Sequence, residues 1–241
     1  MVKLRLKIEL SGGKIVLPVN YQSILQGFIY SMFDKREYGL FLHEEGYRLN
    51  EKTFKLFVFS NLFGKFSIED QKIIFSNKVC FYISSQEDKF IQYIYGFLMN
   101  NHKVVLGHNI LDIDSIEFVK TPYFKGEKDI KIRTLSPLVA YTTIGKKVLY
   151  YKPSDKEFES YCKDNLMEKE IAYGRSDCSI IFEIKDVIKE KKRIVHFKNT
   201  FYISYTTELL IHTNYETLSY LYDTGLSSKG SAGFGMIVVD V

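Results

Sequence analysis

The order in which hydrophobic patterns follow one another along the chain restricts the folds open to it. Apolar and polar residues alternate over residues 2–9, which is typical of a half-buried strand, and apolar spacings of one and three over 24–33 indicate a helix. Strands, a second helix and a further strand follow. After the polar, turn-prone residues 124–129 the same order returns. Because this is the element order of the ferredoxin-like fold, we predict an α+β protein of two tandem ferredoxin-like (RRM-like) domains, 1–123 and 124–241.

The same patterns place the individual elements. In the first half we expect strands over 2–9, 54–59, 73–84 and 110–119. We also expect three helices: one that Pro18 and Asn20 open, a short one that ends at Gly46, and one over 88–99. In the second half we expect helices over 155–170 and 214–223, and strands over 131–142, 177–185, 192–212 (bent near Phe197) and 234–240. The two halves share this order without obvious sequence identity.

Composition narrows the class of protein. The 18 Tyr and 19 Phe residues favour pleated, half-buried strands. The net charge of +4 is compatible with a polyanionic partner but does not require one. Three widely spaced cysteines, Cys80, Cys162 and Cys178, argue against a disulfide framework. The sequence has no secretory signal pattern and no apolar run of about 20 residues. We therefore expect reduced thiols in a cytoplasmic protein without a membrane partner.

A glycine-rich run at residues 225–236 lies between an expected helix and the final strand. Its four glycines allow a ligand to approach the backbone closely, and its three serines and one lysine supply donors suited to phosphate. The run leads into a strand rather than a helix, which excludes a nucleotide-binding P-loop. The alternative is a flexible turn whose glycines only allow the helix and the strand to pack. Composition alone does not choose between a binding loop and a packing turn.

Residues 225–236 resemble the glycine-rich motif of the repeat-associated mysterious protein superfamily. More narrowly, the whole chain resembles the CRISPR-associated endoribonucleases that process precursor CRISPR RNA, the sixth of the numbered Cas families. The segments that carry this resemblance, in the order that the family shows, are 25–30, 41–44, 55–57, 135–138 and 172–174. The resemblance implies CRISPR repeat RNA as the partner of a monomer or a homodimer, and subunits of a CRISPR effector complex as further partners.

Tyr30, His43 and Lys55 are the candidate catalytic residues. Tyr30 points away from the apolar stripe of its helix, His43 lies near the end of a short helix, and Lys55 interrupts an apolar strand. Taken singly, the commoner explanations are an exposed tyrosine, a helix-end histidine and a snorkelling lysine. In the resembling family a tyrosine, a histidine and a lysine at these positions form the active site. All three residue types match here.

The expected reaction needs such a set of side chains. RNA supplies its own nucleophile, the 2′-OH beside the scissile phosphate. Cleavage then requires a base, an acid for the leaving 5′ oxygen, and a cation for the charge that develops on the phosphate. We expect a 2′,3′-cyclic phosphate and a 5′-hydroxyl as products. We expect no metal and no cofactor, because the remaining histidines are scattered without ligand spacing.

Candidate RNA contacts fall in two segments. The glycine-rich run supplies Ser227, Ser228, Lys229, Gly230, Ser231, Gly233 and Gly235. An expected hairpin of the second domain supplies Lys191, Lys192 and Arg193. A run of charge is usually a solvated turn, and the functional interpretation is contact with RNA phosphates.

Two alternatives to a nuclease stay open. The first is a non-catalytic CRISPR RNA-binding subunit of an effector complex, which the same glycine-rich run would serve. The match at Tyr30, His43 and Lys55 favours the nuclease over this subunit. The second is a small-molecule enzyme that holds a phosphorylated ligand, for which the sequence offers no cofactor fingerprint.

Overall fold

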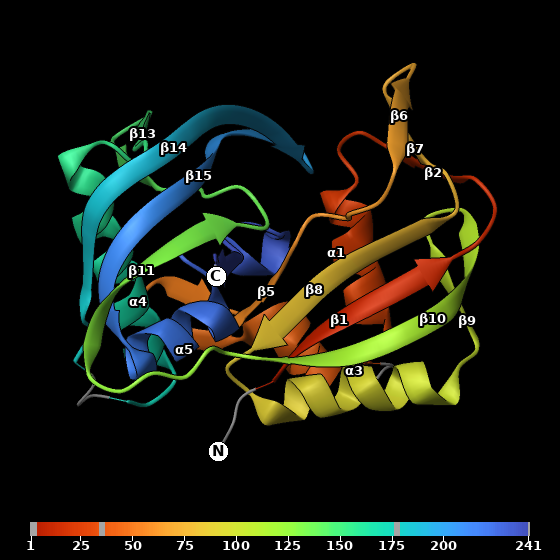
Figure 1. The fold of residues 1–241 in the computed structure, drawn as a ribbon, viewed down its shortest axis with the longest axis horizontal. Coiled ribbons are helices and arrows are strands. Elements are labelled where there is room, and N and C mark those ends of the chain that lie inside the picture. Colours follow the sequence, from red (N-terminus) through yellow and green to blue (C-terminus); the bar gives the residue numbers. More distant parts are fainter. Residues whose placement is uncertain (1–3, 34–36, 176–178, 241) are drawn as a thin grey trace.

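Two antiparallel sheets lie side by side in the molecule, one built from each half of the chain (Figure 1). The structure is a computed structural model that describes residues 4–33, 37–175 and 179–240. The first half contains β1 (Leu4–Ser11), β2 (Ile15–Pro18), α1 (Gln22–Ser31), α2 (Glu37–Leu40), a π-helical turn (Phe41–Glu45), β3 (Tyr47–Leu49), β4 (Lys52–Phe54), β5 (Phe57–Phe59), β6 (Phe66–Glu69), β7 (Lys72–Phe75), β8 (Lys78–Ser85), α3 (Asp88–Asn100), β9 (Lys103–Leu106) and β10 (Asn109–Lys120). The second half contains β11 (Glu127–Thr134), β12 (Tyr141–Ile144), β13 (Lys147–Tyr150), α4 (Lys156–Ala172), β14 (Phe182–Phe197), β15 (Thr200–Asn214), α5 (Tyr215–Thr224), a 3-10 turn (Gly230–Ala232) and β16 (Ile237–Val239).

Both sheets have the ferredoxin-like strand order. The first runs β5-β8-β1-β10, with β9 added at the edge, and the second runs β14-β15-β11-β16. When the four strands of each sheet are counted in chain order, the first strand (β1 or β11) lies between the third (β8 or β15) and the fourth (β10 or β16). Two helices pack against each sheet. The predicted α+β class with tandem ferredoxin-like folds is therefore confirmed. We propose the division between the domains at residues 123 and 124, in the connection from β10 to β11.

Several element predictions were wrong in their bounds. The expected strand 54–59 is two short strands, because Leu56 adopts a φ of +46° that interrupts the extended backbone. The expected strand 73–84 is likewise divided into β7 and β8. The expected strand 131–142 ends at Thr134, and Tyr141 begins a separate hairpin.

The largest error concerns β14 and β15. These strands form one long hairpin, whereas the sequence suggested strands at 177–185 and 192–212. The run of charged residues in β14 concealed the strand, because this part of it is exposed on both faces and shows no apolar–polar alternation. The expected bend near Phe197 is the turn that joins β14 to β15.

Arg5 holds the two halves together. It lies on β1 among residues assigned to the polar face, yet its side chain is only 3% exposed. Its guanidinium donates to the carbonyl oxygens of Ile237 (2.8 Å) and Tyr222 (3.0 Å) and lies 4.2 Å from the centre of the Tyr222 ring. Burial lowers the pKa of Arg5 to about 10, which leaves it cationic at neutral pH.

Lys169 fixes the glycine-rich segment, which we define as residues 225–236. From the buried face of α4 its ammonium donates to the carbonyl oxygens of Thr224 (3.3 Å), Gly225 (3.0 Å) and Ser227 (2.9 Å). Burial lowers the pKa of Lys169 to about 7, and the nearby Cys162 acts weakly in the opposite direction.

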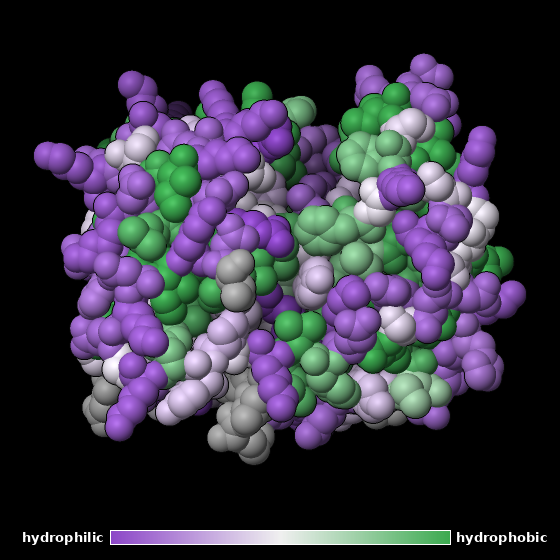
Figure 2. All heavy atoms as spheres, in the orientation of Figure 1, coloured by the Kyte–Doolittle hydropathy of each residue, from purple (hydrophilic) through white to green (hydrophobic). Residues whose placement is uncertain are grey.

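Hydrophilic side chains cover most of the face shown in Figure 2, and hydrophobic ones are visible on both sides of the seam between the halves. Within the described ranges, no helix is long and apolar enough to cross a membrane. Cys80 and Cys162 are free thiols, and Cys178 lies outside the described residues.

We expect Arg5→Ala to lower the free energy of unfolding by about 2–4 kcal/mol, because it leaves two buried carbonyls without their charged donor. Lys7→Ala on the same strand removes only partly exposed ion pairs to Glu9 and Glu117 and should cost less than about 1 kcal/mol. Urea denaturation of both variants measures the difference. Equal losses would contradict a locking role for Arg5.

Lys169 should make stability depend on pH. Between its lowered pKa of about 7 and the ordinary lysine pKa near 10.5, the unfolded chain binds more protons than the folded one. The free energy of unfolding must therefore rise with pH over this window. Denaturation of wild type and Lys169→Met from pH 6.5 to 10 should show a stability difference that grows with pH. A constant difference would show that Lys169 stays fully protonated in the folded protein.

Candidate active site

Tyr30, His43 and Lys55 come together at one place although they lie on three different elements. Tyr30 occupies the last turn of α1, His43 the π-helical turn, and Lys55 the link between β4 and β5. The rings of Tyr30 and His43 meet edge to face with centres 5.3 Å apart. The Lys55 ammonium donates to the His43 carbonyl oxygen at 3.1 Å. The structure thus gathers an imidazole, a phenol and an ammonium at the boundary of the first domain.

Gly46 shapes the backbone at this place. It ends the π-helical turn with a φ of +65°, and its N–H donates to the Phe41 carbonyl oxygen at 2.7 Å. A Cβ at this position would lie 2.6 Å from the Phe54 carbonyl oxygen and 2.9 Å from Cδ of Lys55. Only glycine therefore lets the Lys55 side chain cross the turn beneath His43. Single π-turns of this kind are frequent at functional sites.

The three side chains differ in their exposure to water. His43 is exposed, whereas Tyr30 and Lys55 are half-buried. Tyr30 packs edge to face on Phe57, and its burial raises the pKa of the phenol to about 12, so it stays protonated at neutral pH. Burial also lowers the pKa of Lys55, helped by the nearby charge of Arg48 and opposed by Glu45.

The second half of the chain supports this site from α4. Tyr47 on β3 packs edge to face on Tyr173, with ring centres 5.3 Å apart, and on Phe41 of the π-helical turn at 5.4 Å. Lys52 on β4 forms an ion pair with Glu168 of α4. The hairpin that precedes Lys55 is therefore held by residues more than a hundred positions away. Helical and strand periodicity could not reveal this contact, although 172–174 carried part of the family resemblance.

The glycine-rich segment is mostly buried between the halves. Gly233 has a φ of +83°, and an added Cβ would lie 2.6 Å from the ring of Phe59. At Gly235 the same atom would lie 2.1 Å from the Leu226 carbonyl oxygen. Ser227 is 1% exposed, and its hydroxyl accepts from the Val139 N–H at 3.2 Å. These positions match the packing alternative. The two glycines allow close contact between backbone and neighbouring groups, and the Ser227 hydroxyl is used for a hydrogen bond inside the fold.

The remaining predicted contacts of this segment lie nearer to solvent. Lys229 is exposed, while Ser228 and Ser231 are half-buried. The Ser228 hydroxyl donates to the Val139 carbonyl oxygen at 2.9 Å, and the Ser231 carbonyl oxygen accepts from the Gln26 amide of α1. Gly230 is buried with its Cα near the Phe57 carbonyl oxygen, where a Cβ would lie at 2.8 Å. Among the predicted side chains of the segment, Lys229 is the freest to meet a phosphate.

The predicted basic residues Lys191, Lys192 and Arg193 are exposed on β14. Further back along this strand, Lys185 pairs with Glu183 and Lys189 pairs with Glu208. Within the described part of the chain, no carboxylate lies at ion-pair distance from the three predicted residues. Their charges are therefore available to an anionic partner.

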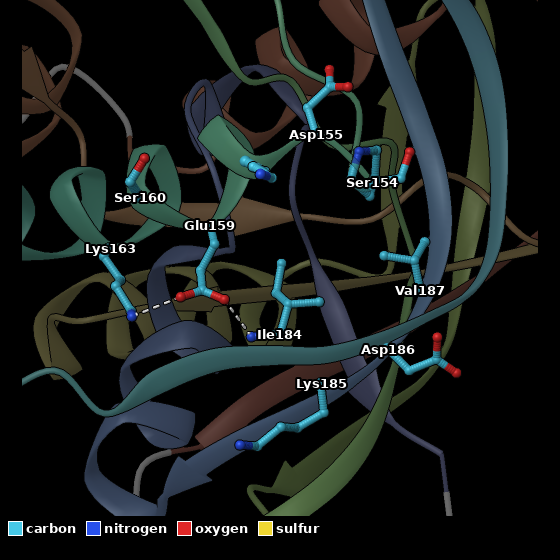
Figure 3. A pocket seen from close by; sticks show the side chains of 11 residues that line it. Ser154, Asp155, Glu159, Ser160, Lys163, Ile184, Lys185, Asp186 and Val187 are labelled. Carbon is cyan, nitrogen blue, oxygen red and sulfur yellow. Dashed lines mark hydrogen bonds and ion pairs between the residues drawn. The ribbon is translucent and has the colours of Figure 1, made fainter.

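An open cavity of about 580 Å³ lies elsewhere, between the start of α4 and β14 (Figure 3). Glu159 in its wall accepts from the Lys163 ammonium and from the Ile184 N–H, both at 2.8 Å. Neither Tyr30, His43 nor Lys55 lines it. Glu159 and Lys163 satisfy each other in this wall, and the cavity is not the candidate active site.

Comparison with known proteins points to one family. The family model described as CRISPR associated protein Cas6, C-terminal, matches residues 119–239, half of the chain. The CRISPR-associated endoribonuclease Cas6 of Pyrococcus furiosus is 30% identical over 98% of this chain and 89% of its own length. The CRISPR-associated endoribonuclease Cas6 1 of Methanocaldococcus jannaschii is 27% identical over 98% of this chain and 92% of its own length.

Solved structures agree with this result. A structure described as CRISPR associated protein Cas6 superposes with a TM-score of 0.80 at 26% identity, covering 99% of this chain and 100% of the other. A structure of a Cas6-related gene product from Pyrococcus furiosus superposes with a TM-score of 0.81 at 22% identity, covering 99% and 98%, and supports the fold alone. With the family model and full-length relatives in agreement, the chain belongs to the Cas6 family.

Proposed function

We propose that this chain is an endoribonuclease that binds CRISPR repeat RNA and cleaves precursor CRISPR RNA within the repeat. The observation that carries the proposal is the meeting of Tyr30, His43 and Lys55 from three separate elements. Two full-length relatives bear the name of CRISPR-associated endoribonucleases, and the family assignment supports the same activity. The reaction we propose is attack of the 2′-OH on the adjacent phosphate, without a metal ion, leaving a 2′,3′-cyclic phosphate and a 5′-hydroxyl.

The environments of the side chains suggest how they divide this work. A phenol with a pKa raised to about 12 is a donor at neutral pH, so Tyr30 suits protonation of the leaving 5′ oxygen or a hydrogen bond to the phosphate. The exposed imidazole of His43 can then take the proton of the 2′-OH. Lys55, oriented by the His43 carbonyl, places a positive charge where the phosphate becomes more negative.

We propose that the RNA is held across both domains. The contacts proposed from the glycine-rich segment are Ser227, Ser228, Lys229, Gly230, Ser231, Gly233 and Gly235. Lys229 offers an exposed charge, Ser228 and Ser231 are half-buried, and the four buried residues hold the segment in shape. Lys191, Lys192 and Arg193 on β14 add exposed positive charge for phosphates. Gly233 cannot take a side chain without strain, so Lys229→Ala is the sharper test of RNA contact in this segment.

His43→Ala should slow cleavage by about 10²-fold or more, because it removes a general acid–base group, while RNA binding changes little. Tyr30→Phe and Lys55→Ala should each slow the reaction less. Single-turnover cleavage of labelled repeat RNA at saturating protein isolates the chemical step. His108→Ala, an exposed histidine in the turn before β10, is the matched control and should behave as wild type. Wild-type rates in folded His43→Ala would instead favour a non-catalytic RNA-binding subunit.

Cleavage should persist in excess EDTA, because the proposed proton transfers and charge stabilisation come from side chains alone. Mass spectrometry of the products should find a 2′,3′-cyclic phosphate on the upstream fragment. A strict requirement for Mg²⁺ or Mn²⁺, or a 3′-hydroxyl product, would rule out the proposed mechanism while leaving the nuclease assignment open to another one.

A further inference from the structure

The hairpin of β14 and β15 ends in an arm with two different faces. The arm arches from the second sheet toward the first half of the molecule (Figure 1). On its inner face Val195 and Phe197 are buried against Ala232 and Phe234 of the glycine-rich segment. The side chains of His196 and its cross-strand partner Phe201 therefore lie on the outer face, since neighbouring residues of a strand alternate. The inner contacts make the arm a fixed part of the structure.

Two flat rings lie stacked on the outer face. The rings of His196 and Phe201 have centres 4.4 Å apart and planes inclined by 19°. Phe201 is 66% exposed, and Ile194 on the same face is 68% exposed. From the other side of the interdomain seam, the Asn20 amide lies 3.1 Å from Nδ1 of His196 and holds that ring in place. The outer phenyl ring is thus orientated by a supported imidazole and presents apolar surface to water.

The charge around these rings is positive. Lys192 shares the outer face. Lys198 lies in the turn at the tip of the arm, with its ammonium 5.6 Å from the centre of the Phe197 ring. The carboxylate of Glu190 is already engaged by the N–H of Ser154. A flat apolar surface flanked by lysine side chains complements a single-stranded nucleic acid, whose bases stack on aromatic rings while its phosphates meet lysine and arginine.

Helix α1 connects the two stacked rings with the candidate active site. Asn20 lies two residues before α1, Gln26 in the middle of α1 contacts Ser231 of the glycine-rich segment, and Tyr30 lies in its last turn. Ten residues of helix correspond to roughly 15 Å along the axis. A strand of RNA bound at Phe201 could therefore follow α1 past the glycine-rich segment to the catalytic set.

We propose that Phe201, backed by His196, is a stacking platform for one unpaired nucleobase of the bound RNA. Lys192 and Lys198 contact the flanking phosphates. This proposal rests on the proposed function, since it names a binding subsite of the same RNA. It requires the aromatic ring itself, and not only its hydrophobicity.

The test uses the full chain and a repeat RNA methylated at every 2′-OH, which can bind but has no nucleophile. Phe201→Ala should weaken binding about 10-fold, and Phe201→Tyr should restore it, because the loss comes from one stacked base. Phe66→Ala is the matched control: Phe66 is a 55% exposed phenylalanine on the β6–β7 hairpin of the other half and should leave affinity unchanged. Unchanged affinity in Phe201→Ala, or full affinity in Phe201→Leu, would overturn the proposal.

Abasic substitutions along the same RNA locate the base. At one position the abasic RNA should lose as much affinity as Phe201→Ala does, and the two changes together should cost no more than either alone. Additive losses at every position would overturn the stacking contact. Cleavage of unmodified RNA is measured separately. If the protein cleaves RNA in a His43-dependent way but Phe201→Ala binds RNA normally, the stacking platform is wrong and the nuclease assignment stands. If Phe201→Ala and the abasic RNA lose affinity together but the wild-type protein does not cleave, the nuclease assignment is wrong and the platform stands.

Discussion

The close packing of residues 225–236 against Phe57 and Phe59 is the constraint on which the rest of the structure depends. Gly230 and Gly233 touch this strand so tightly that no side chain would fit at either position. Since Lys55 lies two residues before β5, the packing of the glycine-rich segment on β5 also constrains the position of this lysine. Arg5 and Lys169 secure the same joint, each by donating to buried carbonyl groups of the segment between Tyr222 and Ile237.

This arrangement unites the two interpretations that composition left open for the glycine-rich run. Most of its glycines allow close packing, as a structural turn would, and the hydroxyl of Ser227 is used inside the fold. The segment nevertheless presents Lys229 to solvent and supports the aromatic arm through Ala232 and Phe234. A rigid support and a binding surface are compatible roles, because a preorganised surface loses less entropy when its ligand binds.

The order of elements was predictable because each buried sheet face and helix stripe leaves its own period in the sequence. β1 and α1 illustrate this, since their apolar residues all enter one core. The failures occur where burial does not follow such a period. Arg5 was assigned to the solvated face because its burial depends on the other domain. The alternation of β14 is lost because residues 191–194 are exposed on both faces of the strand.

The candidate site likewise has features that the sequence near each residue predicts and features that depend on contacts with distant parts of the chain. The resemblance to the family nominated both Tyr30 and Lys55. Tyr30 was expected opposite the apolar stripe but packs against the core, and the backbone of Lys55 was wrongly assigned to a strand. Its actual setting requires a positive φ at Leu56 and the close crossing at Gly46, neither of which has a periodic signal. The bracing of Tyr47 by Tyr173 also depends on how the domains dock. Residue chemistry can therefore nominate the members of a site that spans elements, but only the packing between the halves determines the distances at which they meet.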